Sequence, residues 1–378
     1  MRIAMITDSY HPTKDGVVTS LDITKGVLES IGHEVSVIAP DPGEKDRIPG
    51  VHYFPAIGFK WYEGYFLPVL PSNKIEILRR IDPDVIHVHG IAFMAVKALI
   101  AARTLKKPIV MTFHTMVGDT MKYYSPVKMP EELSERLVWI YLRNILKRVD
   151  ALILPTAPIA DELAGKGVNT KNMTVIPTGI DTLRFVPGSG AKIRERYGIK
   201  DKKVVIHVGR ISFEKNIHIA VEAMGSVDGA VLMIVGKGPA EDSIRKTVAE
   251  NGLCDRVIFT GFVGDDELTD HYNAADAAVS ASEFETQGLS VLEAMSCGLP
   301  VACVGVRAFA EFVRDGYNGH LFDGTPEGCA NALKLCLSAD DDMRKNARST
   351  AESFSLDKVA VKLTELYEAA ISDKKNVC

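Results

Sequence analysis

Short apolar runs alternate with segments of helical periodicity along most of the chain. Mostly apolar runs predict buried strands at 2–7, 35–39, 84–89, 108–113, 151–155, 204–208, 231–235, 257–259, 277–280 and 301–306. Between several of them, apolar residues recur at helical spacing, as they do at 17–31, 123–148 and 289–295. Strands that alternate with helices predict parallel sheets with helices on both faces, which is the α/β class.

The length of the chain indicates two such units. At 378 residues it exceeds what a single hydrophobic core usually contains. A polar linker and a basic helix occupy 182–203. We therefore expect one Rossmann-like domain over residues 1–181 and a second over 182–355.

Composition and charge narrow the class of protein. Apolar residues make up 46% and charged residues 25% of the chain, as in an ordinary soluble protein, and the net charge of −5 argues against nucleic acid as the main partner. All six cysteines lie at or beyond Cys254 and none forms a CxxC pair, which favours a reducing compartment. The N-terminal residues lack the apolar core of a signal peptide, so we expect a cytoplasmic protein.

The most informative stretch is 280–306, SASEFETQGLSVLEAMSCGLPVACVGV. A polar loop leads to Gly288, and an apolar helix follows, with Leu289 and Ser290 in its first turn. The N–H groups of a helix N-terminus bind anions such as a diphosphate. Glu285 before the helix and Glu293 within it can accept hydrogen bonds from sugar hydroxyls. The stretch predicts a pocket for a phosphorylated sugar, whereas the alternative is an amphipathic helix with solvated glutamates.

The spacing of these residues also resembles a known signature. Glu285-x7-Glu293, followed by Ala294-Met295 and Gly298-x-Pro300-Val301, resembles the motif of the retaining glycosyltransferases of family 4. This family has the GT-B fold, which consists of two Rossmann-like domains with a cleft between them. The resemblance runs from about residue 2 to 371, and it implies that the C-terminal helix 356–371 packs back on the first domain.

Two loops in the first half match the family as well. The segment Asp8-x-Tyr10-x-Pro12 to Asp15-Gly16-Val17 resembles the first loop of the family, in which the glycine lets the backbone approach the donor. His114 ends the strand 108–113 and resembles the family histidine that lies close to the transferred sugar. The alternatives are a plain turn at Gly16 and a structural histidine at 114.

Strand-end loops in the second half supply the expected phosphate and base contacts. Gly209-Arg210 and Lys215 match the family pattern G-R-x4-K, and two cations at a strand-to-helix loop suit a diphosphate; a solvated surface pair is the alternative. A tight turn at Gly236 closes the strand 231–235, and Val263 resembles the loop that lies along the nucleobase.

These matches imply a role for each residue. Arg210, Lys215 and the N–H groups of Leu289 and Ser290 would stabilise the departing diphosphate. Glu285 would hold sugar hydroxyls near the anomeric carbon, Glu293 would bind the ribose hydroxyls, and His114 would contact the sugar. The resemblance implies a UDP- or GDP-linked hexose donor, front-face attack by the acceptor hydroxyl, and no required cofactor or metal.

The acceptor is less constrained. Glu-Thr-Gln-Gly at 285–288 resembles lipid glycosyltransferases. Aromatic residues between Phe59 and Leu70, together with the basic pair Lys147-Arg148, suit a peripheral contact with the inner membrane face. The same aromatics would equally well pack beneath their own loop. A departure from the family pattern, Arg307-Ala308-Phe309 in place of a Gly-Gly turn, leaves the neighbouring contacts open.

Other functions remain as alternatives to lipid glycosylation. They are transfer to a soluble sugar or polyol, a nucleotide-sugar epimerase of the same architecture, and a non-catalytic nucleotide-sugar sensor, because a fold alone does not decide function. His87 and His89 lie two residues apart on one strand and face the same side of it. Further metal ligands are not evident nearby, so we interpret these two histidines as structural.

Overall fold

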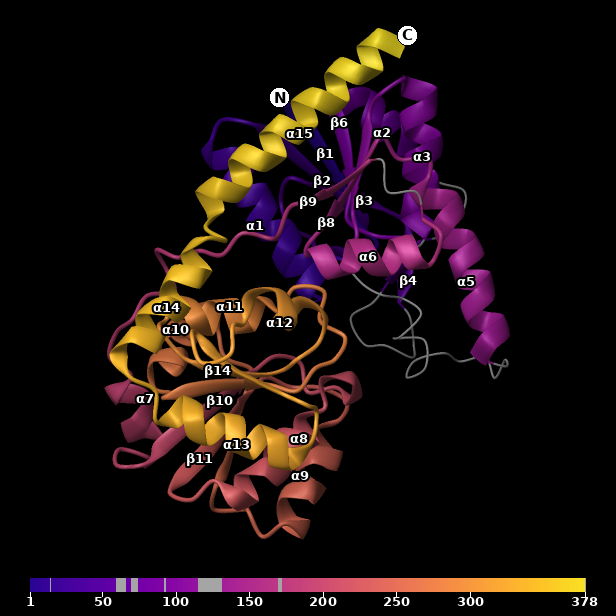
Figure 1. Ribbon diagram of the computed structural model, residues 1–378. Helices are drawn as coiled ribbons and strands as arrows, with labels where there is room; N and C mark the ends of the chain where they lie inside the picture. Colours follow the sequence, from indigo (N-terminus) through magenta and orange to yellow (C-terminus); the bar gives the residue numbers. More distant parts are fainter. Residues whose placement is uncertain are drawn as a thin grey trace. The chain divides into compact units, whose positions relative to one another are not determined.

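The computed structural model describes residues 1–13, 15–58, 66–68, 74–91, 93–114, 131–168 and 172–377. It divides into two compact units, one formed by Met1–Gly179 with Leu356–Cys378 and the other by Ile180–Ser355. Figure 1 shows both units, with the N-terminal residues in indigo and the C-terminal helix in yellow. Each unit is built around its own parallel sheet.

The main sheet of the first unit has seven strands in the order β3-β2-β1-β6-β7-β8-β9, and every neighbouring pair is parallel. They are β1 (Arg2–Ile6), β2 (Glu34–Pro40), β3 (Val51–Phe54), β6 (Val85–Val88), β7 (Ile109–Thr112), β8 (Ala151–Leu154) and β9 (Met173–Val175). A short antiparallel pair, β4 (Ala56–Gly58) and β5 (Phe66–Pro68), lies outside this sheet.

Helices cover both faces of this sheet because successive strand residues point to opposite sides. Ile3 and Met5 join a core with α1 (Gly16–Ser30) and α15 (Leu356–Val377). Ala4 and Ile6 join the opposite core, to which four helices contribute: α2 (Lys74–Ile81), α3 (Phe93–Leu105), α5 (Glu131–Leu146) and α6 (Ala157–Gly165).

The C-terminal helix packs on the first unit, beside α1 (Figure 1). It continues beyond residue 371, where the sequence predicted its end. One reason is that Lys374 Nζ lies 3.0 Å from Asp150 Oδ1, which ties the last turns to the sheet. Among the described residues, no helix combines the length and apolarity that crossing a bilayer requires.

The second unit has six parallel strands in the order β12-β11-β10-β13-β14-β15 around one core. They are β10 (Lys203–Val208), β11 (Ala230–Val235), β12 (Val257–Gly261), β13 (Ala277–Ser280), β14 (Val301–Val304) and β15 (Gly319–Phe322). Its helices are α7 (Ala191–Arg196), α8 (Ile217–Ala223), α9 (Glu241–Glu250), α10 (Asp265–Asn273), α11 (Leu289–Ser296), α12 (Arg307–Phe312), α13 (Pro326–Leu337) and α14 (Asp341–Glu352). The predicted α/β class with two parallel-sheet units is confirmed.

Candidate functional site

The predicted anion-binding helix, α11, begins directly after Gly288 at the end of a loop that follows β13. Gly288 has a φ of 80°, and a Cβ atom there would lie 2.5 Å from Cε1 of Phe309. Both the backbone conformation and the packing therefore require glycine. As at any helix start, the first N–H groups, those of Leu289 and Ser290 among them, have no partner within the helix.

Glu285 lies in that loop and forms an ion pair with Lys215. Lys215 ends a short 3-10 turn, Phe213–Lys215, that follows β10, so the fold brings together two predicted site residues from distant parts of the second unit. Their side chains are 21% and 24% exposed, so water and small ligands reach the pair. The carboxylate expected to hold a sugar thus neutralises the cation expected to hold a phosphate.

Arg210 is held by a carboxylate that the sequence analysis did not single out. Its Nη2 lies 3.4 Å from Oε1 of Glu214, and Ser212 Oγ donates to the same oxygen at 2.7 Å. Glu214 is buried, whereas Arg210 is partly exposed. Glu214 therefore orients the guanidinium group. In the sequence, the spacing of four residues between Arg210 and Glu214 could have indicated this ion pair.

Glycines allow the strand-end loops to approach one another closely. Gly236 has a φ of 135°, and a Cβ atom there would lie 2.0 Å from the carbonyl oxygen of Gly209. Gly209 itself has a φ of 152° and donates its N–H to the carbonyl of Val235 at 3.0 Å. Val263 follows β12, the next strand of the sheet, and packs partly buried against the core. These loops lie at the same carboxyl edge of the sheet as Arg210.

Glu293 lies on α11, and its carboxyl group is hydrogen-bonded to Tyr272 of α10. The Tyr272 hydroxyl donates to Oε2 of Glu293 at 2.7 Å and also lies 3.1 Å from the carbonyl oxygen of Ser290. Burial raises the pKa of Glu293 to about 7, and the Tyr272 hydrogen bond offsets part of that rise. Burial therefore favours the protonated form of Glu293 far more than it would be favoured in an exposed glutamate. Tyr272 is a second site residue that the sequence analysis missed.

The first unit contains the other two predicted site residues. Gly16 starts α1, whose N-terminus is capped by Asp15 Oδ1, which accepts from the N–H groups of Val17 and Val18 at 2.9 Å. Open space surrounds a Cβ atom at Gly16, so packing within the described residues does not require glycine there. His114 follows β7, and burial lowers its pKa to about 4.

The departure at Arg307 has a structural consequence. Arg307 has a φ of 47°, the left-handed conformation that a glycine adopts without strain. Its guanidinium group lies 5.4 Å from the ring centroid of Phe284, the residue before Glu285. The chain therefore keeps the backbone turn that a glycine would make and adds a cation beside the loop that contains Glu285.

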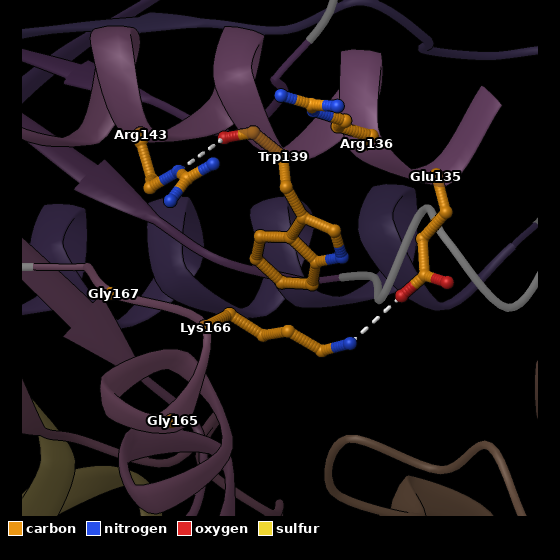
Figure 2. Close-up of a pocket in the computed structure, with 7 residues that line it drawn as sticks. All are labelled: Glu135, Arg136, Trp139, Arg143, Gly165, Lys166 and Gly167. Carbon is orange, nitrogen blue, oxygen red and sulfur yellow. Dashed lines mark hydrogen bonds and ion pairs between the residues drawn. The ribbon is translucent and has the colours of Figure 1, made fainter. Parts of the chain in front are cut away.

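The aromatic segment predicted to touch membranes lies mostly outside the described residues, because 59–65 and 69–73 are not described. Elsewhere in the first unit, α5 and the end of α6 border an open hollow of about 440 Å³ (Figure 2). The Lys166 ammonium group lies 5.5 Å from the Trp139 ring centroid and 2.7 Å from Glu135 Oε1. Arg136 and Arg143 complete a mainly cationic lining.

The sequence matches two family models that together span most of the chain. Residues 14–184 match "Glycosyltransferase Family 4", and residues 190–354 match "Glycosyl transferases group 1". A curated relative, the alpha-monoglucosyldiacylglycerol synthase of Streptococcus pneumoniae, is 31% identical over 92% of this chain and 81% of its own length. The enzyme of the same name from Acholeplasma laidlawii is 30% identical over 100% of this chain and 98% of its own.

More distant relatives and solved structures extend the comparison. A GDP-mannose-dependent alpha-mannosyltransferase of Corynebacterium glutamicum is 28% identical over 85% of this chain and 77% of its own. The crystal structure of Anabaena HepE with UDP matches with a TM-score of 0.80 at 21% identity, covering 98% of this chain and 100% of that one. This likeness confirms the predicted GT-B fold.

Proposed function

Because the chain belongs to glycosyltransferase family 4, we propose that it transfers glucose from UDP-glucose to a lipid hydroxyl, with diacylglycerol as the acceptor. It is a hexosyltransferase of the retaining class. The observation that carries the proposal is the grouping of Arg210, Lys215 and Glu285 with the start of α11 in the second unit. Two cations, a carboxylate and free helix N–H groups are the set that a sugar diphosphate needs.

Donor binding exchanges the partners within the ion pair. The diphosphate takes Lys215 and the N–H groups of Leu289 and Ser290, and Glu285 is released to accept a sugar hydroxyl. Arg210 is already oriented by Glu214, so it reaches the diphosphate without a large reorganisation. Donors that are fixed before the reaction stabilise developing charge most effectively.

The chemical step is front-face substitution at the anomeric carbon. The bond from this carbon to the diphosphate oxygen breaks, and the bond to the acceptor oxygen forms on the same face. The acceptor proton passes to the departing phosphate oxygen, so the products are the α-glycoside and UDP. Arg210 and Lys215 stabilise the negative charge that grows on the diphosphate, and His114 contacts the transferred sugar.

The choice of donor and acceptor follows the relatives. The two glucosyldiacylglycerol synthases align with nearly the whole chain, whereas the mannosyltransferase aligns with less of it at lower identity. This comparison favours glucose over mannose and a lipid over a soluble acceptor. UDP is the nucleotide in the HepE complexes, whose fold this chain shares.

A surface on α5 supports contact with a membrane. Leu133, Leu137 and Ile140 lie on one face of the helix at positions i, i+4 and i+7, and they are 47%, 50% and 43% exposed. Arg136 and Arg143 border this face, and beyond them lies the hollow with Lys166 (Figure 2). Exposed apolar side chains next to cations are typical of helices that lie in the interface of an anionic bilayer.

Incubation with labelled substrates tests the function directly. UDP-glucose or GDP-mannose is mixed with diacylglycerol in phosphatidylglycerol vesicles, or with glycerol in solution, and the products are separated by thin-layer chromatography. We expect an α-glucosyl lipid from UDP-glucose and vesicles. A soluble glycoside, an epimerised nucleotide sugar, or binding without turnover would contradict the proposal in favour of the corresponding alternative.

Flotation with the same vesicles tests the membrane surface. Leu137→Glu combined with Ile140→Glu should release the protein from the vesicles. The control Val361→Glu changes an apolar side chain of α15 that is 57% exposed and should leave binding intact. Equal binding by both variants would show that α5 is not the contact.

A further inference from the structure

A line of buried side chains leads from the C-terminal helix to His114 within the first unit. The Tyr367 hydroxyl of α15 lies 2.7 Å from Nδ1 of His87 on β6. The ring of His87 packs against that of His89, with centroids 4.1 Å apart. His89 Nδ1 then lies 3.0 Å from Nε2 of His114. Three histidines and one tyrosine therefore form a continuous set of contacts.

All three histidines are neutral at pH 7. Burial lowers the pKa of His87 to about 3 and that of His114 to about 4, and it holds the pKa of His89 well below its usual value. A neutral imidazole carries one proton, on either Nδ1 or Nε2. The position of this proton decides which nitrogen of His114 donates a hydrogen bond.

The surroundings of His89 determine the position of its proton. His89 Nε2 is buried and has no hydrogen-bond partner among the described residues. A proton there would leave a buried N–H group without an acceptor, which is rarer than a buried lone pair without a donor. His89 therefore carries its proton on Nδ1 and donates it to Nε2 of His114, whose own proton must then lie on Nδ1.

The same reasoning determines the position of the proton on His87, at the other end of this set of contacts. The Tyr367 hydroxyl is fully buried, and the one partner the described residues offer it is His87 Nδ1, so Tyr367 is the donor. The proton of His87 then lies on Nε2 and points to Thr112 Oγ1 at 2.7 Å. His87 is therefore fixed by hydrogen bonds on both nitrogens, and its ring forms a rigid surface against which His89 packs.

We propose that His89 is a positioning residue, which fixes His114 as the neutral tautomer with its proton on Nδ1. This inference rests on the proposed contact between His114 and the transferred sugar. In this tautomer, His114 donates an N–H hydrogen bond to a sugar oxygen and does not act as a base. The contact between the end of β6 and the end of β7 thus determines the hydrogen-bonding character of His114.

Nitrogen NMR of protein labelled with ¹⁵N-histidine tests the tautomer without any substrate. His114→Asn identifies the His114 signals by their loss. We expect the wild type to show a protonated Nδ1 and an unprotonated Nε2 at His114. A protonated Nε2 would overturn the proposal.

Variants at His89 separate positioning from folding. His89→Leu removes the donor, whereas His89→Asn places an amide N–H close to the original Nδ1. We expect His89→Leu to change the tautomer of His114 and to lower kcat about tenfold, the typical effect of one lost hydrogen bond, with little change in KM for UDP-glucose. His89→Asn should restore most of the rate. The control Tyr367→Phe should lower the melting temperature but leave the His114 tautomer unchanged.

The outcomes distinguish this inference from the proposed function. If His89→Leu alters the tautomer while glucosyl transfer continues at the wild-type rate, His89 positions His114 but the sugar contact is wrong. If the tautomer and the rate are both unchanged in a folded His89→Leu protein, the positioning role itself is refuted. If His89→Leu does not fold, the wild-type spectrum and the His89→Asn rate still decide.

Discussion

Donor affinity should depend on pH through the carboxyl group of Glu293. Burial raises its pKa to about 7, and the Tyr272 hydroxyl donates to its carboxyl group. A carboxylate accepts two hydroxyl hydrogen bonds, whereas a protonated carboxyl group must give up part of that capacity. If Glu293 binds the ribose hydroxyls, the ionised form binds the nucleotide more tightly, and binding at neutral pH releases a proton.

The size of the effect follows from the pKa. With a value near 7, about one carboxyl group in eleven is ionised at pH 6 and about ten in eleven at pH 8. Because the apparent affinity scales with the competent fraction, Kd for UDP-glucose should fall about tenfold between these two pH values. Binding at pH 7 should release about half a proton per site.

Isothermal titration calorimetry in buffers with different ionisation enthalpies measures both quantities. UDP-glucose is the suitable ligand because its diphosphate diester has no proton to lose in this range. Glu293→Gln cannot ionise, so its affinity should be lower and independent of pH. A wild-type Kd that is unchanged from pH 6 to 8, or a Glu293→Gln protein that keeps the wild-type dependence, would refute the assignment of Glu293.

The same group affects the stability of the ligand-free protein in the opposite direction. The folded state binds the Glu293 proton more tightly than the unfolded state, whose carboxyl pKa is near 4.5. The stabilisation is complete below the unfolded value and is lost as the pH rises through about 7. Thermal unfolding of wild type and Glu293→Gln across this window should therefore converge at low pH and diverge above it.

Three further predictions concern the other site residues. Glu285→Ala should slow glucosyl transfer about 100-fold or more while UDP binding persists, and near-native turnover in a product assay would contradict its role. Arg210→Ala and Lys215→Ala should each weaken binding of UDP more than that of uridine in calorimetry, and equal losses for both ligands would argue against a diphosphate contact. Gly288→Ala should lower the melting temperature, since its Cβ atom would meet Phe309 and its φ is positive; an unchanged melting temperature would mean that the loop adapts freely.

The sequence was sufficient to predict the fold because burial of the strands determines both the apolar runs in the sequence and the packing of the sheets. Strands buried on both faces are continuous apolar runs, and this is what the segments at β1, β7, β10, β11 and β14 contain. The end of α15 was less predictable. Its last turns are polar, and the contact between Lys374 and Asp150 joins residues 224 positions apart.

The site residues were predictable as types but not as pairs. Lys215 and Glu285 were each predicted from the sequence of their own loop. Their ion pair joins residues 70 positions apart, so neither loop indicates it. Tyr272 was missed because it lies in the last turn of a polar helix, and its role depends on a carboxyl group 21 positions away. The tyrosine that holds His87 is 280 positions distant, so local spacing contains no signal for it.

A protein group holds each charged residue proposed to bind the donor. Lys215 contacts Glu285, Arg210 contacts Glu214, and Glu293 accepts from a tyrosine. With the proposed roles, donor binding would exchange one set of hydrogen bonds for another, and the net gain from each exchange would be modest. The Lys215–Glu285 pair differs from the other two contacts, because both of its members are proposed to bind the donor. Each regains a partner only when the diphosphate and the sugar bind together. If Lys215 binds the diphosphate and Glu285 the sugar, as proposed, UDP alone would take Lys215 and leave Glu285 without its cation, so the paired site would favour the intact nucleotide sugar over the product that must leave.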